Sequence, residues 1–210
     1  MKQLIIVGAR GFGRELFSAS QECIGYGVEF VVKGFLDSKL DALNGFEGYP
    51  PILGSPDNYE IKPDDVFITA LGDPQWRRHY VDLMESKGAR FLSLIHRSAA
   101  IGKNVKIGEG VYIARNAMFS VDIHVGNHVC VFNDAIVGHD AWIGNFSHLS
   151  AQTFMGGGSR MEDGAVLHPG ARVAPHKRVG ENAVVGIGSV VVSNVKDNTV
   201  VFGMPAQEFM

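Results

Sequence analysis

A six-residue repeat of apolar residues dominates the second half of the sequence. Counted from Ile101 in steps of six to Val191, sixteen consecutive positions are apolar, and the position two residues earlier is small or β-branched in the first eight repeats. One large and one small inward residue per hexad is typical of a parallel β-helix, in which three hexads, or eighteen residues, form one coil of a triangular prism. The repeat predicts just over five coils, roughly 25 Å in length at the inter-strand spacing, and Asp197 breaks it.

The first half of the sequence has a different pattern, in which apolar strands alternate with helical segments. Alternation of this kind predicts a small parallel α/β sheet. Strands are expected at Gln3–Val7, at 29–37, at 66–72 and at 91–95, and helices are expected in the segment after Gly13 and from Pro74 to Gly88. We therefore expect an α/β domain over residues 1–95 and the β-helix over residues 96–210.

Composition excludes several classes of partner. The net charge is −3 and no basic cluster occurs, so nucleic acid and anionic membranes are not expected to bind. The apolar stretch "LIIV" near the N-terminus is too short for a signal peptide core or a membrane span. Cys23 and Cys130 have no metal-like spacing and are expected to be buried thiols of a cytoplasmic protein.

Apolar residues on the outside of the predicted prism suggest that prisms pack side by side. Met118, Ile136 and Trp142 stand at outward-facing positions of the hexads. Packing against a neighbouring copy would bury them and cover the coil edges. A homotrimer about an axis parallel to the prisms is the expected assembly.

Several motifs together resemble the sugar acyltransferases of the NeuD/PglD type. These motifs are "IIVGARGFG", "LIHRSAAIG", "GHDAWIGNFSHLS" and "VFGMPA", and the resemblance covers essentially the whole chain. The family comprises sialic acid O-acetyltransferases and N-acetyltransferases of nucleotide-linked 4-amino sugars. The resemblance implies a Rossmann-like nucleotide-sugar-binding domain, a left-handed β-helix, a trimer, and acetyl-CoA bound between neighbouring prisms.

His139 and Asp140 are the candidate catalytic residues. His139 follows the apolar Val137 by two places, at a predicted turn with an outward side chain. An imidazole suits removal of a proton near neutral pH, and an adjacent carboxylate can orient it. From position alone, His139 could equally be a polar turn residue, as Asn127 and Asn145 are. The resemblance implies that His139 is the catalytic base and that Asp140 orients it.

The resemblance also implies a binding site for acetyl-CoA. The implied contacts are His148, the backbone N–H of Gly157 as an oxyanion donor, and the prism edge of Pro169 and Ile187. His148 could instead line the trimer interface, and Gly157 could ease a tight corner. Gln207 stands where the family often has a basic residue, and the other candidates for the phosphates are Arg160, Arg172, Lys177 and Arg178.

The segment "GARGFGRE" (residues 8–15) forms a glycine-rich turn between a strand and a helix. Such turns let backbone amides approach a phosphate, but the spacing departs from the dinucleotide fingerprint, so NAD is not expected. The resemblance implies that Arg10, Gly11 and Phe12 face the nucleotide sugar, and that Asp37, Ser38 and Gly72 surround the nucleoside. Phe12 replaces a histidine that is usual in the family, and Asp73 stands where asparagine is frequent.

The expected activity is acetyl-CoA-dependent acetylation of the amino group of a nucleotide-linked sugar, in glycan precursor synthesis in the cytoplasm. O-acetylation of a sialic acid is an alternative, and a non-catalytic nucleotide-sugar-binding trimer is another. A zinc site of the γ-carbonic anhydrase kind is not expected, because the histidine spacing does not reproduce it. The remaining histidines of the repeat are expected to be mostly solvated: His124, His128, His168 and His176.

Overall fold

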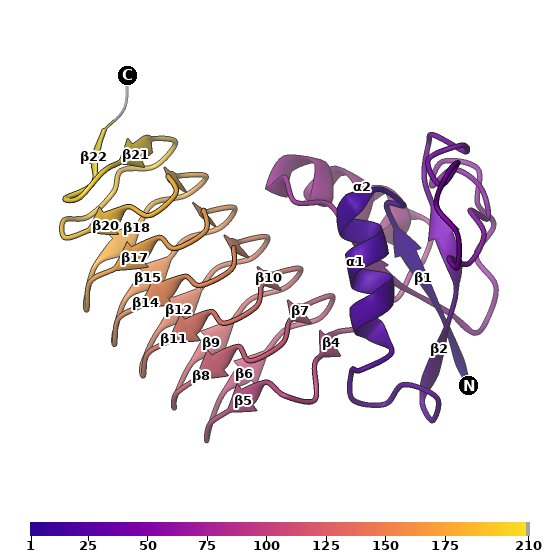
Figure 1. Cartoon of the computed structure of the whole chain (residues 1–210), viewed down its shortest axis with the longest axis horizontal. Coiled ribbons are helices and arrows are strands. Elements are labelled where there is room, and N and C mark those ends of the chain that lie inside the picture. The colour runs from indigo at the N-terminus through magenta and orange to yellow at the C-terminus, as the bar shows by residue number, and fades with distance from the viewer. Residues whose placement is uncertain (209–210) are drawn as a thin grey trace. The chain divides into compact units, whose positions relative to one another are not determined.

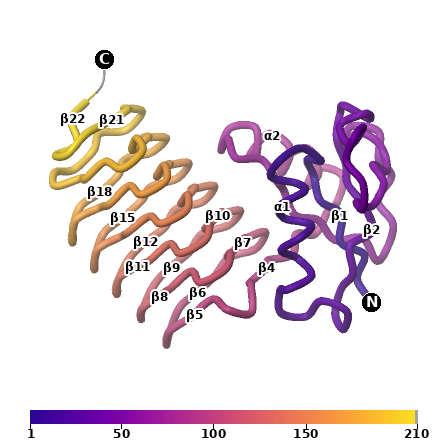
Figure 2. Tube along the Cα trace, viewed as in Figure 1, coloured from indigo at the N-terminus to yellow at the C-terminus, as the bar shows by residue number. Residues whose placement is uncertain are grey.

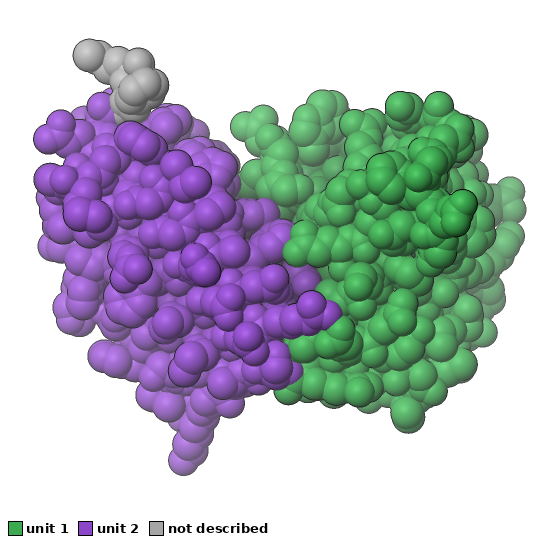
Figure 3. All heavy atoms as spheres, viewed as in Figure 1, with its two compact units in different colours: residues 1–97 green, residues 98–210 purple. Residues whose placement is uncertain are grey.

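The computed structural model describes residues 1–208, and the chain divides into two compact units (Figure 3). The first unit comprises residues 1–97 and the second begins at Ser98. The boundary lies two residues after the expected one. Among the described residues, neither helix reaches the length and hydropathy that a membrane crossing requires. Cys23 and Cys130 are buried thiols that form no disulfide, as expected.

The first unit is a three-stranded parallel sheet with two helices (Figure 1). Its strand order is β2-β1-β3, and the elements are β1 (Lys2–Val7), α1 (Gly11–Ser20), β2 (Phe30–Leu36), β3 (Asp65–Thr69) and α2 (Pro74–Ser86). The predicted α/β class is confirmed. The third strand ends at Thr69 rather than at residue 72, and of the segment 91–95 only β4 (Leu94–Ile95) is a strand.

Apolar side chains of all three strands and of α2 form the core of this unit. Ile5, Leu36, Phe67 and Met84 are completely buried in one cluster. The turn after β1 is tight, because a Cβ on Gly13 would collide with the carbonyl oxygen of Gly8. This close approach directs the start of α1 to the carboxyl end of β1, where the loops after all three strands converge.

The second unit is a left-handed parallel β-helix whose coils are seen in succession in Figure 2. Sixteen two-residue strands, β5 to β20, each end at one of the sixteen predicted apolar positions. The strands are β5 (Ala100–Ile101), β6 (Lys106–Ile107), β7 (Tyr112–Ile113), β8 (Met118–Phe119), β9 (His124–Val125), β10 (Cys130–Val131), β11 (Ile136–Val137), β12 (Trp142–Ile143), β13 (His148–Leu149), β14 (Phe154–Met155), β15 (Arg160–Met161), β16 (Val166–Leu167), β17 (Arg172–Val173), β18 (Arg178–Val179), β19 (Val184–Val185) and β20 (Val190–Val191). The hexad prediction is confirmed.

The strands stack into three faces, each named here after one strand. The β11 face contains β5, β8, β11, β14, β17 and β20, and the β12 face contains β6, β9, β12, β15 and β18. The β13 face includes β7, β10, β13, β16 and β19, and it ends with β21 (Val200–Phe202) and β22 (Gln207–Glu208). Neighbours in a face are eighteen residues apart, as in the pairs of Ile136 with Met118 and with Phe154.

The corner between the β11 and β12 faces is the one that carries the candidate catalytic pair. We call it the β11–β12 corner. One residue per coil there has a left-handed backbone, with φ between 57° and 65°: Asn104, Asp122, Asp140, Gly158 and His176. Glycine and, among other residues, asparagine and aspartate adopt this conformation most easily. The hexad repeat therefore fixes both which side chains point inward and where the chain turns.

The last coil is shorter than the others. Val179 pairs with Val195 and Val184 pairs with Val200, so the spacing falls from eighteen to sixteen residues. The missing two residues lie between Val191 and Val195. This shortening explains why the repeat read from the sequence fails at Asp197, whose side chain instead accepts hydrogen bonds from the N–H of Glu181 and from Arg178.

A buried carboxylate in the first unit gives a prediction about stability. Asp65 accepts hydrogen bonds from Lys33 Nζ at 2.7 Å, from Tyr59 Oη at 2.8 Å and from the N–H of Lys62 at 2.8 Å. Burial alone would raise the pKa of Asp65, but these hydrogen bonds outweigh it and hold the pKa below the ordinary value. A carboxyl group with a lowered pKa stabilises the fold above its ordinary pKa, and this stabilisation is lost as the pH falls through the lowered value.

We expect Asp65→Ala to lower the free energy of unfolding at pH 7 by about 3 kcal/mol, because it removes the counter-ion of Lys33 and the acceptor of Tyr59. The difference between Asp65→Ala and wild type should shrink when the pH is lowered below 3. Urea unfolding at both pH values measures it. An equal difference at both values would contradict the assigned role of the carboxylate.

Candidate active site

His139 and Asp140 form a hydrogen-bonded pair at the β11–β12 corner. The Nδ1 atom of His139 lies 2.7 Å from Oδ2 of Asp140, and the two side chains are 60% and 67% exposed. An ionised carboxylate only accepts hydrogen bonds, so Nδ1 carries the proton and Nε2 keeps a basic lone pair. The pair therefore presents a base to solvent in a fixed tautomer.

The basic nitrogen of His139 lies against Gly157, one coil further along the prism. A Cβ on Gly157 would stand 2.5 Å from Nε2 of His139 and 2.7 Å from its Cε1. Any side chain at this position would therefore displace the imidazole. The N–H of Gly158 donates to the carbonyl of His139 at 2.7 Å, which joins the two coils at this point.

The backbone N–H of Gly157 is placed to serve as a donor to a ligand. Within residues 1–208, no hydrogen bond is formed by this N–H. A Cβ on Gly138 would stand 2.7 Å from the nitrogen, so the absence of a side chain at Gly138 keeps its surroundings open. Sequence reasoning missed Gly138, because glycine recurs at the same place in other hexads, as at Gly126 and Gly144.

The predicted acetyl-CoA contacts fall at two separate places on one chain. Gly157 lies beside His139, whereas His148 lies on the β13 face, with its ring 4.9 Å from that of Phe132. Pro169 and Ile187 are exposed at the corner that follows the β13 face. The structure of one chain thus brings together His139, Asp140 and Gly157, and it does not bring His148, Pro169 or Ile187 to them.

Two of the four other histidines differ from the expectation that they are solvated. His128 is only 3% exposed, because its ring lies over Gly110 and stacks on Phe146 at a centroid distance of 5.1 Å. His124 is half-buried against the ring of Trp142, and burial lowers its pKa, with a further contribution from Lys106. His168 and His176 are exposed, as expected.

The basic residues of the β-helix differ in whether carboxylates already hold them. Arg178 contacts Glu162 at 2.9 Å and Asp197 at 2.8 Å, and these hydrogen bonds, that of Glu162 first, raise the pKa of the guanidinium. Arg160 lies 3.8 Å from Glu162. In the described part of the chain, neither Arg172 nor Lys177 forms an ion pair. Of the four candidates, these two are therefore the ones that no carboxylate within residues 1–208 holds.

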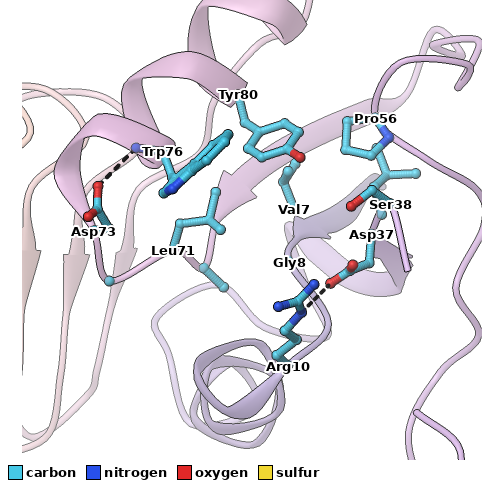
Figure 4. Close-up of a pocket in the computed structure, with 13 residues that line it drawn as sticks. Val7, Gly8, Arg10, Asp37, Ser38, Pro56, Leu71, Asp73, Trp76 and Tyr80 are labelled. Atoms are coloured by element: carbon cyan, nitrogen blue, oxygen red, sulfur yellow. Dashed lines mark hydrogen bonds and ion pairs between the residues drawn. The ribbon is translucent and has the colours of Figure 1, made fainter. Parts of the chain in front are cut away.

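The first unit contains a cavity of about 460 Å³ at the carboxyl ends of its strands (Figure 4). Four of the six predicted substrate residues line it, namely Arg10, Asp37, Ser38 and Gly72. Gly11 and Phe12 do not line it. Figure 4 shows the rings of Trp76 and Tyr80, from α2, on one side of the cavity, and Arg10 beside Asp37 on the other.

Asp37 is the fixed polar group of this cavity. Its two carboxylate oxygens accept hydrogen bonds from the N–H of Ala9 and of Lys39, both at 2.9 Å, and Nε of Arg10 lies 4.0 Å away. Sequence reasoning missed Trp76 and Tyr80. The signal for Trp76 was its place in the first turn of a helix that starts just beyond the carboxyl end of β3.

The glycines between the end of β1 and the first turn of α1 serve different purposes. Gly8 has a φ of 106°, and Gly13 is required by close packing, so the backbone alone accounts for both. A Cβ on Gly11 would meet nothing within 4 Å, and no side chain caps the start of α1. The first turn of α1 is thus open to an approaching ligand, and helix N-termini favour anions.

Two family models match the chain in consecutive segments. Residues 3–84 match the PglD N-terminal domain, and residues 90–202 match the GMPPB C-terminal domain. Over 117 residues, or 54% of the chain, the sequence is 29% identical to UDP-N-acetylbacillosamine N-acetyltransferase of Bacillus subtilis. The match covers about half, 51%, of the length of that curated relative.

Solved structures match the whole chain. The acetyltransferase domain of PglB from Neisseria gonorrhoeae has a TM-score of 0.89 and 25% identity, with all of both chains covered. A mutant of perosamine N-acetyltransferase from Caulobacter crescentus, in complex with CoA and GDP-perosamine, has the same TM-score and 24% identity, and covers 100% of this chain and 98% of its own. At 24% identity, the match to the perosamine N-acetyltransferase mutant shows similarity of fold only.

The contact between His139 and Gly157 predicts the effect of one methyl group. We expect Gly157→Ala to move the imidazole of His139 away from the corner. The coil should stay folded, because the φ of Gly157 lies outside the left-handed region and alanine can adopt it. The imidazole resonances of His139 in NMR spectra should shift, while the unfolding midpoint changes little.

Gly11→Ala serves as the control for this variant, because its added methyl group meets nothing. Unchanged His139 resonances in Gly157→Ala would show that the imidazole does not rest on the glycine.

Proposed function

Because the chain belongs to the PglD-type family of sugar acyltransferases, we propose that it transfers the acetyl group of acetyl-CoA to the amino group of a nucleotide-linked sugar. Its β-helix belongs to the GMPPB C-terminal domain family. The observation that carries this proposal is the His139–Asp140 pair, with its basic Nε2 against Gly157. The relative from Bacillus subtilis is named as an N-acetyltransferase of this kind. Two buried cysteines that form no disulfide suit a cytoplasmic reaction, which would supply precursors of a surface glycan.

The proposed reaction follows from the atoms at the β11–β12 corner. The amine nitrogen attacks the thioester carbon while Nε2 of His139 takes a proton from it, and the positive charge that develops on the imidazole is stabilised by Asp140. The N–H of Gly157 donates to the oxygen of the tetrahedral intermediate. The carbon–sulfur bond then breaks, the thiolate of CoA leaves, and it takes up the proton from His139.

The nucleotide of the acceptor is proposed to bind in the cavity of the first unit. Its volume of about 460 Å³ lies within the range of small-molecule sites. Trp76 and Tyr80 offer aromatic surfaces for a base, and Asp37 offers carboxylate oxygens to N–H or hydroxyl groups. The open start of α1 at Gly11 suits the phosphates. Phe12 lies outside the cavity lining, so the family histidine that it replaces is not needed to form this cavity.

We further propose that the active unit is a homotrimer with acetyl-CoA between neighbouring prisms. Met118, Ile136 and Phe154 are consecutive neighbours on the β11 face and are 52%, 42% and 36% exposed. A contiguous apolar strip of this kind marks an interaction surface. His148 lies on the β13 face, whereas His139 lies at the β11–β12 corner of the same prism, so only a neighbouring copy could bring a His148 to the base.

The proposed activity predicts release of free thiol from acetyl-CoA in the presence of UDP-linked or GDP-linked amino sugars. We expect His139→Ala to reduce kcat about 10²- to 10⁴-fold, the usual contribution of a general base. Asp122→Asn is the matched control, because Asp122 occupies the same corner one coil before Asp140, has the same left-handed φ and should leave turnover unchanged. Full turnover by His139→Ala would exclude His139 as the base.

The same assay separates the alternative functions. Thiol release with free sialic acid but with no amino sugar would indicate O-acetylation. No release with any acceptor, together with nucleotide binding that Trp76→Ala abolishes in calorimetry, would indicate a non-catalytic binding protein.

The trimer predicts a solution mass three times the chain mass of 22.7 kDa in sedimentation equilibrium. Phe154→Asp should yield monomers with an unchanged circular dichroism spectrum, because the exposed side chain contributes little to the core of its own coil. Val28→Asp, at an exposed apolar residue of the first unit, should leave the trimer intact. Monomeric wild-type protein with full turnover would contradict an interfacial site.

A further inference from the structure

A second exposed imidazole lies at the β11–β12 corner, beyond the His139–Asp140 pair. His176 occupies the position of Asp140 two coils later, about 10 Å along the prism, with a φ of 60°. Its Nδ1 lies 2.5 Å from the place of a Cβ on Gly158, so its ring turns back toward the preceding coil. Its own N–H donates to the carbonyl of Gly157 at 3.0 Å.

The glycine run of residues 156–158 thus lies between two imidazoles. A side chain on Gly157 would collide with His139 from the preceding coil, and a side chain on Gly158 would collide with His176 from the following coil. The N–H of Gly157, which has no acceptor within residues 1–208, lies in this strip of bare backbone. The strip can therefore accommodate an extended ligand that follows the corner.

The backbone does not require a histidine at position 176. The other left-handed positions of this corner are Asn104, Asp122, Asp140 and Gly158. These residue types adopt the conformation at low cost. The turn therefore does not explain why position 176 carries an imidazole, a side chain with one nitrogen that donates and one that accepts a hydrogen bond.

We propose that His176 hydrogen-bonds to the amide-containing pantetheine arm of the acyl-CoA donor, one coil beyond the reacting carbonyl. This inference rests on the proposed function. With the thioester oxygen at the N–H of Gly157, the imidazole of His139 occupies the side toward the preceding coil. The arm of the donor then leaves toward the following coil, where His176 lies, and an amide group of the arm can pair with Nε2, the ring nitrogen that does not face Gly158.

The test compares two ligands of the full-length protein by calorimetry, CoA and 3′,5′-ADP, the latter being the nucleotide part of CoA without the arm. His176→Gly removes the imidazole and tolerates the left-handed φ. We expect it to raise the Kd of CoA about threefold to tenfold, which corresponds to one lost hydrogen bond, and to leave the Kd of 3′,5′-ADP unchanged. In turnover, KM for acetyl-CoA should rise while kcat changes less, and His176→Asn should recover part of the affinity.

Asp122→Gly is the matched control, because it makes the same kind of change at the same corner but before His139. An unchanged Kd of CoA in His176→Gly would overturn the inference, and so would an equal loss for CoA and 3′,5′-ADP. Both results leave wild-type thiol release intact, whereas failure of the proposed function would appear as absence of thiol release from the wild type itself.

Discussion

Backbone hydrogen bonds between successive coils, over a spacing of eighteen residues, hold the candidate active site together. The N–H of Gly158 donates to the carbonyl of His139, and the N–H of His176 donates to the carbonyl of Gly157. Residues that are distant in the sequence thus become consecutive along one corner of the prism. The spacing depends in turn on the inward apolar residue of each hexad, such as Val137, which is almost completely buried. The apolar repeat, rather than local contacts, therefore sets the geometry of the site.

The sequence predicts the coils well, because a six-residue period is a property of the backbone path. It does not predict which histidines are buried, because burial depends on the residue eighteen positions away. His128 is buried because its ring lies over Gly110 of the preceding coil and stacks on Phe146 of the following coil. His139 instead lies against a glycine in the following coil and stays exposed. A glycine eighteen residues before or after a histidine thus indicates toward which coil the imidazole turns. The hexad period alone does not contain this information.

In the first unit, the family resemblance implied that Asp37 and Gly72 surround a nucleoside. Both residues line the cavity, because they follow β2 and β3 and the carboxyl ends of parallel strands meet at one edge. Trp76 and Tyr80 come from α2, and the face that this helix turns toward the sheet depends on its packing through buried Arg77 and Val81. That packing is a tertiary property, which explains why two aromatic rings of the cavity were not foreseen.

The shortened last coil has a consequence for the end of the prism. A parallel β-helix with regular coils exposes, at its last coil, three strand edges that could template another chain. Here Val195 pairs with β18, β21 pairs with β19, and Gly203 and Ala206 bond to Val190 of β20. The antiparallel β22 then reverses the chain direction beside β21. A coil that is two residues shorter, followed by an antiparallel strand, is a poor template for end-to-end stacking of prisms. These residues therefore disfavour growth of the prism into a fibre.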